Sequence, residues 1–201
     1  MGRLRTVRFD EVTDETMRSV FQYVFGPDAT DGSPTLDGTP GDWWRTFALV
    51  PTIFQHCVGG FALYRSPSRF LPPELRELGQ TRAGWLMESA FVFSQHVKSC
   101  RLIGMPEEKI QAIPSWAVST VFDAQERAVL AYVDELVGAR GRVSDGVFAE
   151  LAAHLSDEQI LELTYITALY AMHAMMTRAL RLEWDGVDER VREMPGEAVT
   201  R

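Results

Sequence analysis

Residues 76–100 read RELGQTRAGWLMESAFVFSQHVKSC, and this stretch decides the fold because it holds two helical patterns with a natural turn between them. Glu77 and His96 stand 19 residues apart, which on one straight helix would separate them by roughly 28 Å of rise. They can meet only if the chain reverses between them, and Gly84 together with the Glu88–Ser89 pair is the natural place for that reversal. If the chain reverses there, the two helices form a hairpin across which a carboxylate and an imidazole can meet.

The two predicted helices each present one face to the other. We expect the second helix to run from about residue 90 to residue 103 and to be closed by Gly104. Spacings of three and four residues place a set of side chains on one face of each helix. These are Ser89, Val92, Phe93, His96 and Cys100 on the second helix, and Glu77, Thr81 and Gly84 on the first.

The rest of the chain repeats helical periods and capping signals. Asp42 is expected to cap a helix that continues, kinked at Pro51, to about residue 64. Asp123 is placed to cap another helix, and Ser156-x-x-Gln159 has the form of a capping box before a long apolar helix. Strand-like alternation bounded by turns does not occur. The sequence therefore predicts an all-α fold.

The composition of the chain argues against several classes of function. The chain has 201 residues, 46% apolar and 24% charged, which is ordinary for one globular domain. A formal charge of −8 argues against nucleic-acid partners and against a polybasic membrane-binding role, since both need clustered Lys and Arg. The residues from 185 to 201 are charged, carry no apolar stripe and are expected to form a polar C-terminal arm.

A few residues are enough to predict the cellular compartment and whether metal or disulfide sites are expected. The basic first residues are not followed by an apolar signal region, and the most apolar window, residues 47–64, is too short and too polar to span a bilayer. We therefore expect a cytoplasmic protein. Cys57 and Cys100 fit neither a disulfide framework nor a metal-ligand spacing, and four His without Cys or carboxylate partners at ligand spacing predict no metal site.

Three motifs together carry a family resemblance: the Glu77-to-His96 frame, FDAQERAVLAYVDEL from Phe122, and ELTYITALYAMHAMMTRAL from Glu162. The chain resembles the carboxymuconolactone decarboxylase and alkyl hydroperoxidase AhpD-like superfamily, in which a Glu on one helix precedes Cys-x-x-Cys-x-x-x-His on the next. The resemblance implies an AhpD-like multi-helix orthogonal bundle as a single domain over residues 1–184. Residues 1–70 would form an N-terminal helical extension and residues 71–184 the family core. It also implies a homo-oligomer: a dimer, trimer or hexamer.

Ser89 and Val92 stand where the family has its two cysteines. The peroxidase branch needs a thiolate, which neither residue can supply, so activity of that kind is disfavoured. The decarboxylase branch works without metal or organic cofactor, and the resemblance implies His96 as proton donor or base with Glu77 as its partner. A buried Glu is expected to have a raised pKa. We therefore predict a cofactor-free acid/base enzyme acting on a small unsaturated acid, lactone or enone.

Substrate contacts are predicted around the pair, with Arg82 or Arg76 as a ligand for a substrate carboxylate. The predicted substrate-binding residues are Trp85, Arg82, Ser89, Val92, Phe93, Gln95, Tyr170 and His173. Two alternatives stay open. One is an AhpD-type redox enzyme that uses Cys100 or Cys57; the other is a catalytically silent binding member in which Glu77 and His96 form a purely structural pair.

Overall fold

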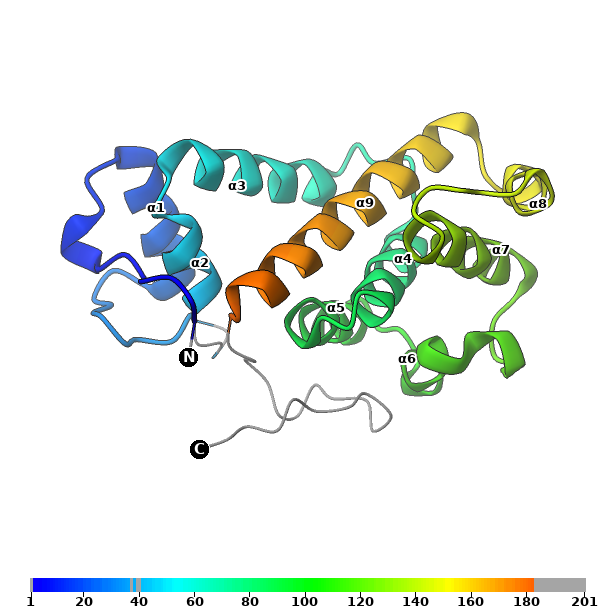
Figure 1. Cartoon of the computed structure of the whole chain (residues 1–201), viewed down its shortest axis with the longest axis horizontal. Coiled ribbons are helices and arrows are strands. Elements are labelled where there is room, and N and C mark those ends of the chain that lie inside the picture. Colours follow the sequence, from blue (N-terminus) through cyan, green and yellow to red (C-terminus); the bar gives the residue numbers. More distant parts are fainter. Residues whose placement is uncertain (1, 37, 39–40, 183–201) are drawn as a thin grey trace. The chain divides into compact units, whose positions relative to one another are not determined.

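The computed structural model describes residues 2–36, 38 and 41–182, and within these residues it contains helices and turns but no strand (Figure 1). The predicted all-α fold is confirmed. The described chain divides into two compact units, one of residues 2–67 with 177–182 and one of residues 68–176. The predicted single domain over 1–184, with its division near residue 70, stays a prediction, and the predicted arm from residue 185 lies outside the described residues.

The first unit contains four short or medium helices and the last residues of α9. These are η1 (Phe9–Glu11), α1 (Glu15–Phe25), α2 (Asp42–Phe47) and α3 (Pro51–Arg65). Aromatic rings form its core: Phe21 lies 5.3 Å from Phe25 and 5.9 Å from Phe54 between ring centroids, and Trp43 stacks on Phe47 at 4.2 Å.

The predicted single helix from Asp42, kinked at Pro51, is wrong in detail. The structure has two helices, because α2 ends at Phe47 and α3 begins at Pro51 itself. Proline lacks a backbone N–H and is well tolerated in a first turn, where that donor has no intrahelical partner. Pro51 therefore starts a helix rather than bending one. Gly41, not Asp42, occupies the N-cap position of α2.

The second unit holds most of the helices. They are α4 (Pro73–Leu86), α5 (Ala90–Leu102), α6 (Glu107–Ala112), η2 (Ile113–Val118), α7 (Ala124–Val133), the π-helical turn η3 (Asp134–Gly138), α8 (Asp145–His154) and α9 (Asp157–Leu180) up to Met176. Two predicted caps are confirmed. Asp123 and Glu126 exchange reciprocal hydrogen bonds at the start of α7, and Ser156 and Gln159 do so before α9.

Helices α4 and α5 form the predicted hairpin. The reversal occupies residues 87–89, where Glu88 adopts a left-handed conformation (φ 50°) and the side chain of Ser89 accepts a hydrogen bond from the Val92 N–H. Gly84 lies inside α4 rather than at the turn. A Cβ at Gly84 would lie 2.8 Å from the Phe93 backbone nitrogen, so this glycine allows the two helices to approach closely. The short turn and the close packing together fix how side chains on α4 face those on α5.

Candidate functional site

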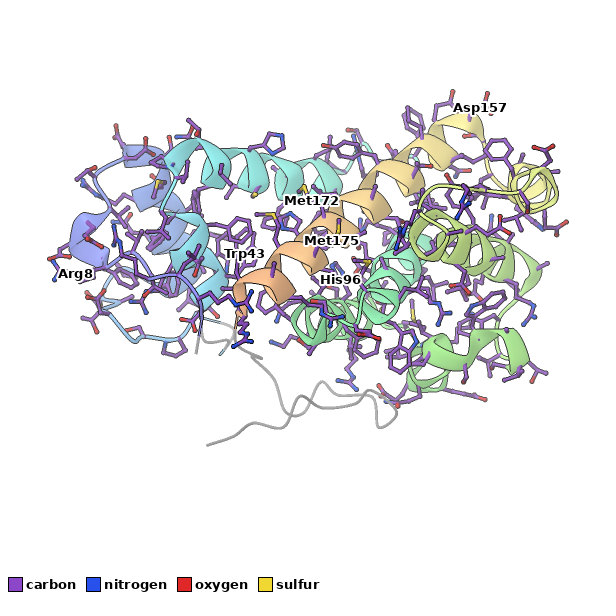
Figure 2. The ribbon with its side chains drawn as sticks, in the orientation of Figure 1. Arg8, Trp43, His96, Asp157, Met172 and Met175 are labelled. Carbon is purple, nitrogen blue, oxygen red and sulfur yellow. The ribbon has the colours of Figure 1, made fainter. Side chains whose placement is uncertain are left out.

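The predicted pair meets at the centre of the α4–α5 hairpin. Glu77 on α4 and His96 on α5 are 1% and 2% exposed, and Glu77 Oε2 lies 2.8 Å from His96 Nδ1. The position of His96 is labelled in Figure 2. The two side chains thus share a buried hydrogen bond although they stand 19 residues apart in the sequence.

Glu77 has further partners on its own helix. Arg76 donates to Oε1 from Nη2 at 3.0 Å and from Nε at 3.2 Å. With the amide of Gln80 oriented to suit its neighbours, its nitrogen donates to Oε2 at 3.1 Å and to Oε1 at 3.3 Å. Both carboxylate oxygens are thus surrounded by donors, and a buried carboxylate with this environment is stabilised in its charged form.

The predicted raised pKa of Glu77 is wrong. Burial alone raises the pKa of this carboxyl, but the hydrogen bond and charge of His96 and the Arg76 guanidinium outweigh burial, so the pKa lies below its ordinary value of 4.5. Glu77 is therefore ionised at neutral pH and can only accept hydrogen bonds. It follows that His96 Nδ1 carries a hydrogen and donates a hydrogen bond to the carboxylate, so that Nε2 is the ring nitrogen that Glu77 leaves unengaged.

His96 Nε2 is buried and has no hydrogen-bond partner among the described residues. The ring of Tyr170, from α9, lies against the imidazole, with 4.2 Å between ring centroids and an interplanar angle of 90°. His173, one turn further along α9 and 2% exposed, lies 5.7 Å from the Tyr170 ring. The structure thus brings Tyr170 to His96 and places His173 beside Tyr170.

Most other predicted substrate contacts lie on the same hairpin. Ser89 is 1% exposed and caps α5, while Val92 and Phe93 are buried and lie closest to Gly84. The half-buried Trp85 packs on Phe93 with 5.8 Å between ring centroids, and Gln95 is half-buried on α5. Their roles as substrate contacts stay predictions.

Arg82 is engaged elsewhere. Its Nε and Nη2 pair with the two carboxylate oxygens of Asp134 at 2.6 and 3.0 Å, and its Nη1 donates to the carbonyls of Ile113 and Pro114 at 3.2 and 2.9 Å. Trp116 Nε1 also donates to Asp134, at 3.0 Å. Arg82 joins α4 to η2 and η3, an arrangement typical of a structural ion pair; its predicted role as a carboxylate ligand stays a prediction.

The two thiols are poor nucleophiles. Burial raises the pKa of Cys100 to about 12, with the charge of nearby Glu77 acting in the same direction and the hydrogen bond with Thr81 acting against it. Burial also raises the pKa of Cys57. Because the thiolate is the reactive form, these environments suppress thiol chemistry at neutral pH.

Sequence reasoning missed Gln80 and the role of Arg76. The sequence does contain a signal for each residue. Arg76 immediately precedes Glu77, and Gln80 follows Glu77 by three residues, a spacing that places both side chains on one helix face. The sequence offers Arg76 as a ligand for a substrate carboxylate, although an arginine on such a helix is more often hydrated or ion-paired. In the structure it is the cation that helps keep Glu77 charged.

The described residues contain neither a candidate metal cluster nor a candidate membrane-spanning helix. No group of three or more His, Cys, Asp or Glu side chains lies close enough to hold a metal ion. Within the same part of the chain, none of the helices has both the length and the apolar character that crossing a membrane requires.

Comparison with known proteins gives one family. The carboxymuconolactone decarboxylase family matches residues 59–135, a range that contains both Glu77 and His96. The uncharacterized protein YnjA of Escherichia coli (strain K12) is 26% identical over 150 residues, which are 74% of this chain and 80% of YnjA.

Two solved structures have a similar fold. A protein of unknown function from Agrobacterium tumefaciens, provisionally assigned to the AhpD antioxidant defence proteins, is 28% identical with a TM-score of 0.64, over 68% of this chain and 92% of its own. An uncharacterized peroxidase-related protein with an AhpD core from Ralstonia eutropha JMP134 shares the fold over 94% of both chains, with a TM-score of 0.77 at 14% identity. The family match over residues 59–135 and the AhpD-like fold of these neighbours support a place for the chain in the carboxymuconolactone decarboxylase and AhpD-like superfamily.

Proposed function

We propose that this protein is a cofactor-free acid/base enzyme in which His96 Nε2 transfers protons to and from carbon. Its substrate class would be a small unsaturated acid, lactone or enone. The observation that carries the proposal is the buried 2.8 Å hydrogen bond from His96 Nδ1 to an ionised Glu77, with the opposite ring nitrogen buried and without a hydrogen-bond partner among the described residues.

This arrangement suits proton transfer for a physical reason. A carboxylate that accepts from Nδ1 fixes the ring orientation and tautomer, and it stabilises the imidazolium that forms when Nε2 takes a proton. Arg76 and Gln80 hold the carboxylate in its charged form, so Glu77 orients His96 and does not itself exchange protons with substrate.

Two reactions fit one base at this position. In an isomerisation, Nε2 removes a proton next to a carbonyl, the electron pair delocalises into the carbonyl, and the same nitrogen returns the proton to a conjugated carbon. In a decarboxylation, the bond to the carboxylate carbon breaks, carbon dioxide leaves, and protonated Nε2 donates its proton to the carbanion. Both need a substrate whose carbanion is delocalised, which is why unsaturated acids, lactones and enones are the proposed class.

A thiol mechanism is less well supported. The family positions for its cysteines hold Ser89 and Val92, and the pKa of Cys100 is raised to about 12. A substitute role for Cys100 would need the thiolate that its burial disfavours.

The test combines turnover with spectroscopy on the full chain. A panel of γ-lactone acids and β,γ-unsaturated ketones is incubated with the protein in D2O, and NMR follows deuterium incorporation and loss of carboxylate. We expect His96→Gln and Glu77→Gln to lower kcat/KM by about 10²–10⁴-fold. Cys57→Ser/Cys100→Ser serves as the matched control and should keep wild-type turnover.

The nitrogen signals of His96 provide a readout that does not need the substrate. Selective 15N labelling should show a protonated Nδ1 in the wild type, and loss of that tautomer preference in Glu77→Gln. Undiminished turnover in His96→Gln, or loss of turnover in the double serine variant, would contradict the proposal. A preference for protonated Nε2 in neutral His96 would also contradict it.

A further inference from the structure

A small cavity lies in the first unit beside α1, which is labelled in Figure 1. Its volume is about 170 Å³, which is room for several water molecules or for one small organic molecule. One face of α1 lines it, together with Phe9 of η1, Val12, and Pro27 and Ala29 in the loop that follows α1. None of these residues takes part in the candidate catalytic site, so the cavity is a separate place for a ligand.

The walls of the cavity are mainly apolar. Val12 and Phe21 line it and are 5% and 3% exposed. The ring of Phe9 stands edge-on to Phe21, with 5.5 Å between ring centroids, and edge-on to Phe25 at 5.2 Å. A ligand with an apolar or aromatic body would bury its surface against these side chains, which is favourable because that surface leaves water.

Arg18 supplies a positive charge at the cavity. Among the described residues that line the cavity, Arg18 alone carries a charge. Its Nη2 donates to the carbonyl of Val12 at 3.2 Å, and the side chain has no other hydrogen-bond or ion-pair partner among the described residues. A carbonyl holds the guanidinium in place without neutralising it, so the remaining donors of Arg18 suit an anionic group.

Helix α1 sets the direction in which such a ligand would lie. Arg18, Gln22 and Gly26 follow each other at intervals of four residues and therefore lie on one face of the helix. Val12 precedes α1, which begins at Glu15, so the guanidinium that binds Val12 lies at the N-terminal end of the helix. The helix dipole favours negative charge at that end and disfavours it near Gly26. The anionic group would thus lie at Arg18 and the apolar body would extend towards Gly26.

We propose that this cavity binds a small monocarboxylate with an apolar or aromatic body. Arg18 binds the carboxylate, and the amide of Gln22, which has no hydrogen-bond partner among the described residues, donates to it from one turn further along α1. The rings of Phe9 and Phe21 contact the body of the ligand. The proposal shares no residue with the reaction assigned to His96 and is tested separately from it.

Amide chemical shifts of the 15N-labelled full chain test the site. The probe is benzoate. Benzyl alcohol keeps the aromatic body without the charge, and inorganic phosphate keeps a negative charge without the body. We expect benzoate to shift the amide signals of Phe9, Gln22 and Gly26 with a dissociation constant of roughly 0.1–1 mM. Benzyl alcohol and phosphate should each bind at least about tenfold more weakly.

Three variants separate charge from shape. Arg18→Met should raise the dissociation constant of benzoate at least about tenfold, because it removes hydrogen bonds between charged groups. Ala29→Leu keeps the charge and fills part of the cavity, so it should also weaken benzoate binding. Arg8→Met is the matched control, since Arg8 belongs to the same unit but is bound by both carboxylate oxygens of Asp10 and does not line the cavity. The affinity for benzoate should not change in that control.

Several results would overturn the proposal. One is the absence of shifts at Phe9, Gln22 and Gly26 up to about 10 mM benzoate, and another is a set of shifts confined to residues around His96. Equal weakening in Arg8→Met and Arg18→Met would show a response to net charge rather than a site. Benzyl alcohol or phosphate binding as tightly as benzoate would remove the role of the charge or of the apolar walls. Amide signals elsewhere in Arg18→Met that match the wild type show that the variant is folded.

Discussion

Two charge networks begin on α4 within five residues of each other, and they differ in one respect. Around Asp134, the carboxylate is paired by Arg82 and Trp116, and Arg82 also donates to two backbone carbonyls. Around Glu77, the carboxylate is equally well paired, but its partner His96 has a second ring nitrogen that is buried without a partner among the described residues. In the first network the remaining donor of Arg82 is bound by backbone carbonyls. In the second, His96 Nε2 has no hydrogen-bond partner among the described residues.

The difference separates a structural network from a candidate catalytic one. Both networks bury charge, so burial and charge alone cannot distinguish them. An unsatisfied buried polar atom is uncommon and calls for an explanation, and a site for a reacting proton is one such explanation. We therefore expect disruption of the Asp134 network to affect stability alone, and disruption of the Glu77 network to affect chemistry and, by a smaller amount, stability.

The largest expected effect on stability is at the Asp134 network. Arg82→Met removes a cation whose side chain is 10% exposed and leaves Asp134, which is 31% exposed, without its charge partner. We expect a loss of about 2–3 kcal/mol in the free energy of unfolding, below the cost of breaking a fully buried pair because Asp134 is partly hydrated. Urea denaturation measures this, and the 15N signals of His96 should not change.

Arg101→Met is the control for that variant. It breaks a comparable bidentate pair with Glu107, but the two side chains are 33% and 52% exposed. The loss should stay under about 1 kcal/mol. Equal losses from the two variants would mean that Arg82 does not join the helices in the way described.

A smaller and pH-dependent effect is expected at Glu77. Because its folded pKa is lowered, the carboxylate contributes stability that is fully present well above 4.5 and is lost as the pH falls through the folded value. Glu77→Gln should therefore cost about 1–2 kcal/mol at pH 7 and progressively less below pH 4.5. Unfolding curves at several pH values measure the difference, and a cost that grows on acidification would contradict the assigned pKa direction.

The smallest effect is expected at Cys100. With a pKa of about 12, the folded thiol should resist alkylation at pH 8 and react fully only after unfolding, tested in a Cys57→Ser background. Because this pKa is raised, the neutral thiol favours folding up to the ordinary pKa of 9.0, and that contribution is lost as the pH rises towards 12. Rapid alkylation of the folded protein would reopen a thiol mechanism.

The hairpin and its central pair were predictable from sequence because they depend on local rules. The turn signal and the helical periodicity locate the reversal, and the family resemblance supplied the expectation that Glu77 and His96 meet across it. The capping residues Asp123 and Ser156 were equally readable, because a cap is decided within four residues.

Some features could not be predicted from the sequence, because they depend on residues distant along the chain or on opposing contributions to a pKa. Arg82 was assigned to substrate because Asp134 lies 52 residues away and nothing local links them. The pKa of Glu77 was predicted to rise because burial was counted without the opposing contributions of His96 and Arg76, which depend on side-chain positions. The prediction of a kink at Pro51 failed because proline can either bend a helix or begin one. The surrounding packing decides between the two, and here α3 begins at Pro51.

The capping role of Ser89 limits how redox activity could be engineered into this chain. Its hydroxyl accepts the Val92 N–H and so closes the first turn of α5, at the position where relatives are expected to carry a cysteine. Introducing a cysteine pair at 89 and 92 would exchange a good hydrogen-bond acceptor for a weak one, at a cost of about 1 kcal/mol in helix stability. Redox chemistry at these positions is therefore separated from this protein by a folding penalty as well as by two substitutions, and compensating changes at the start of α5 would have to accompany them.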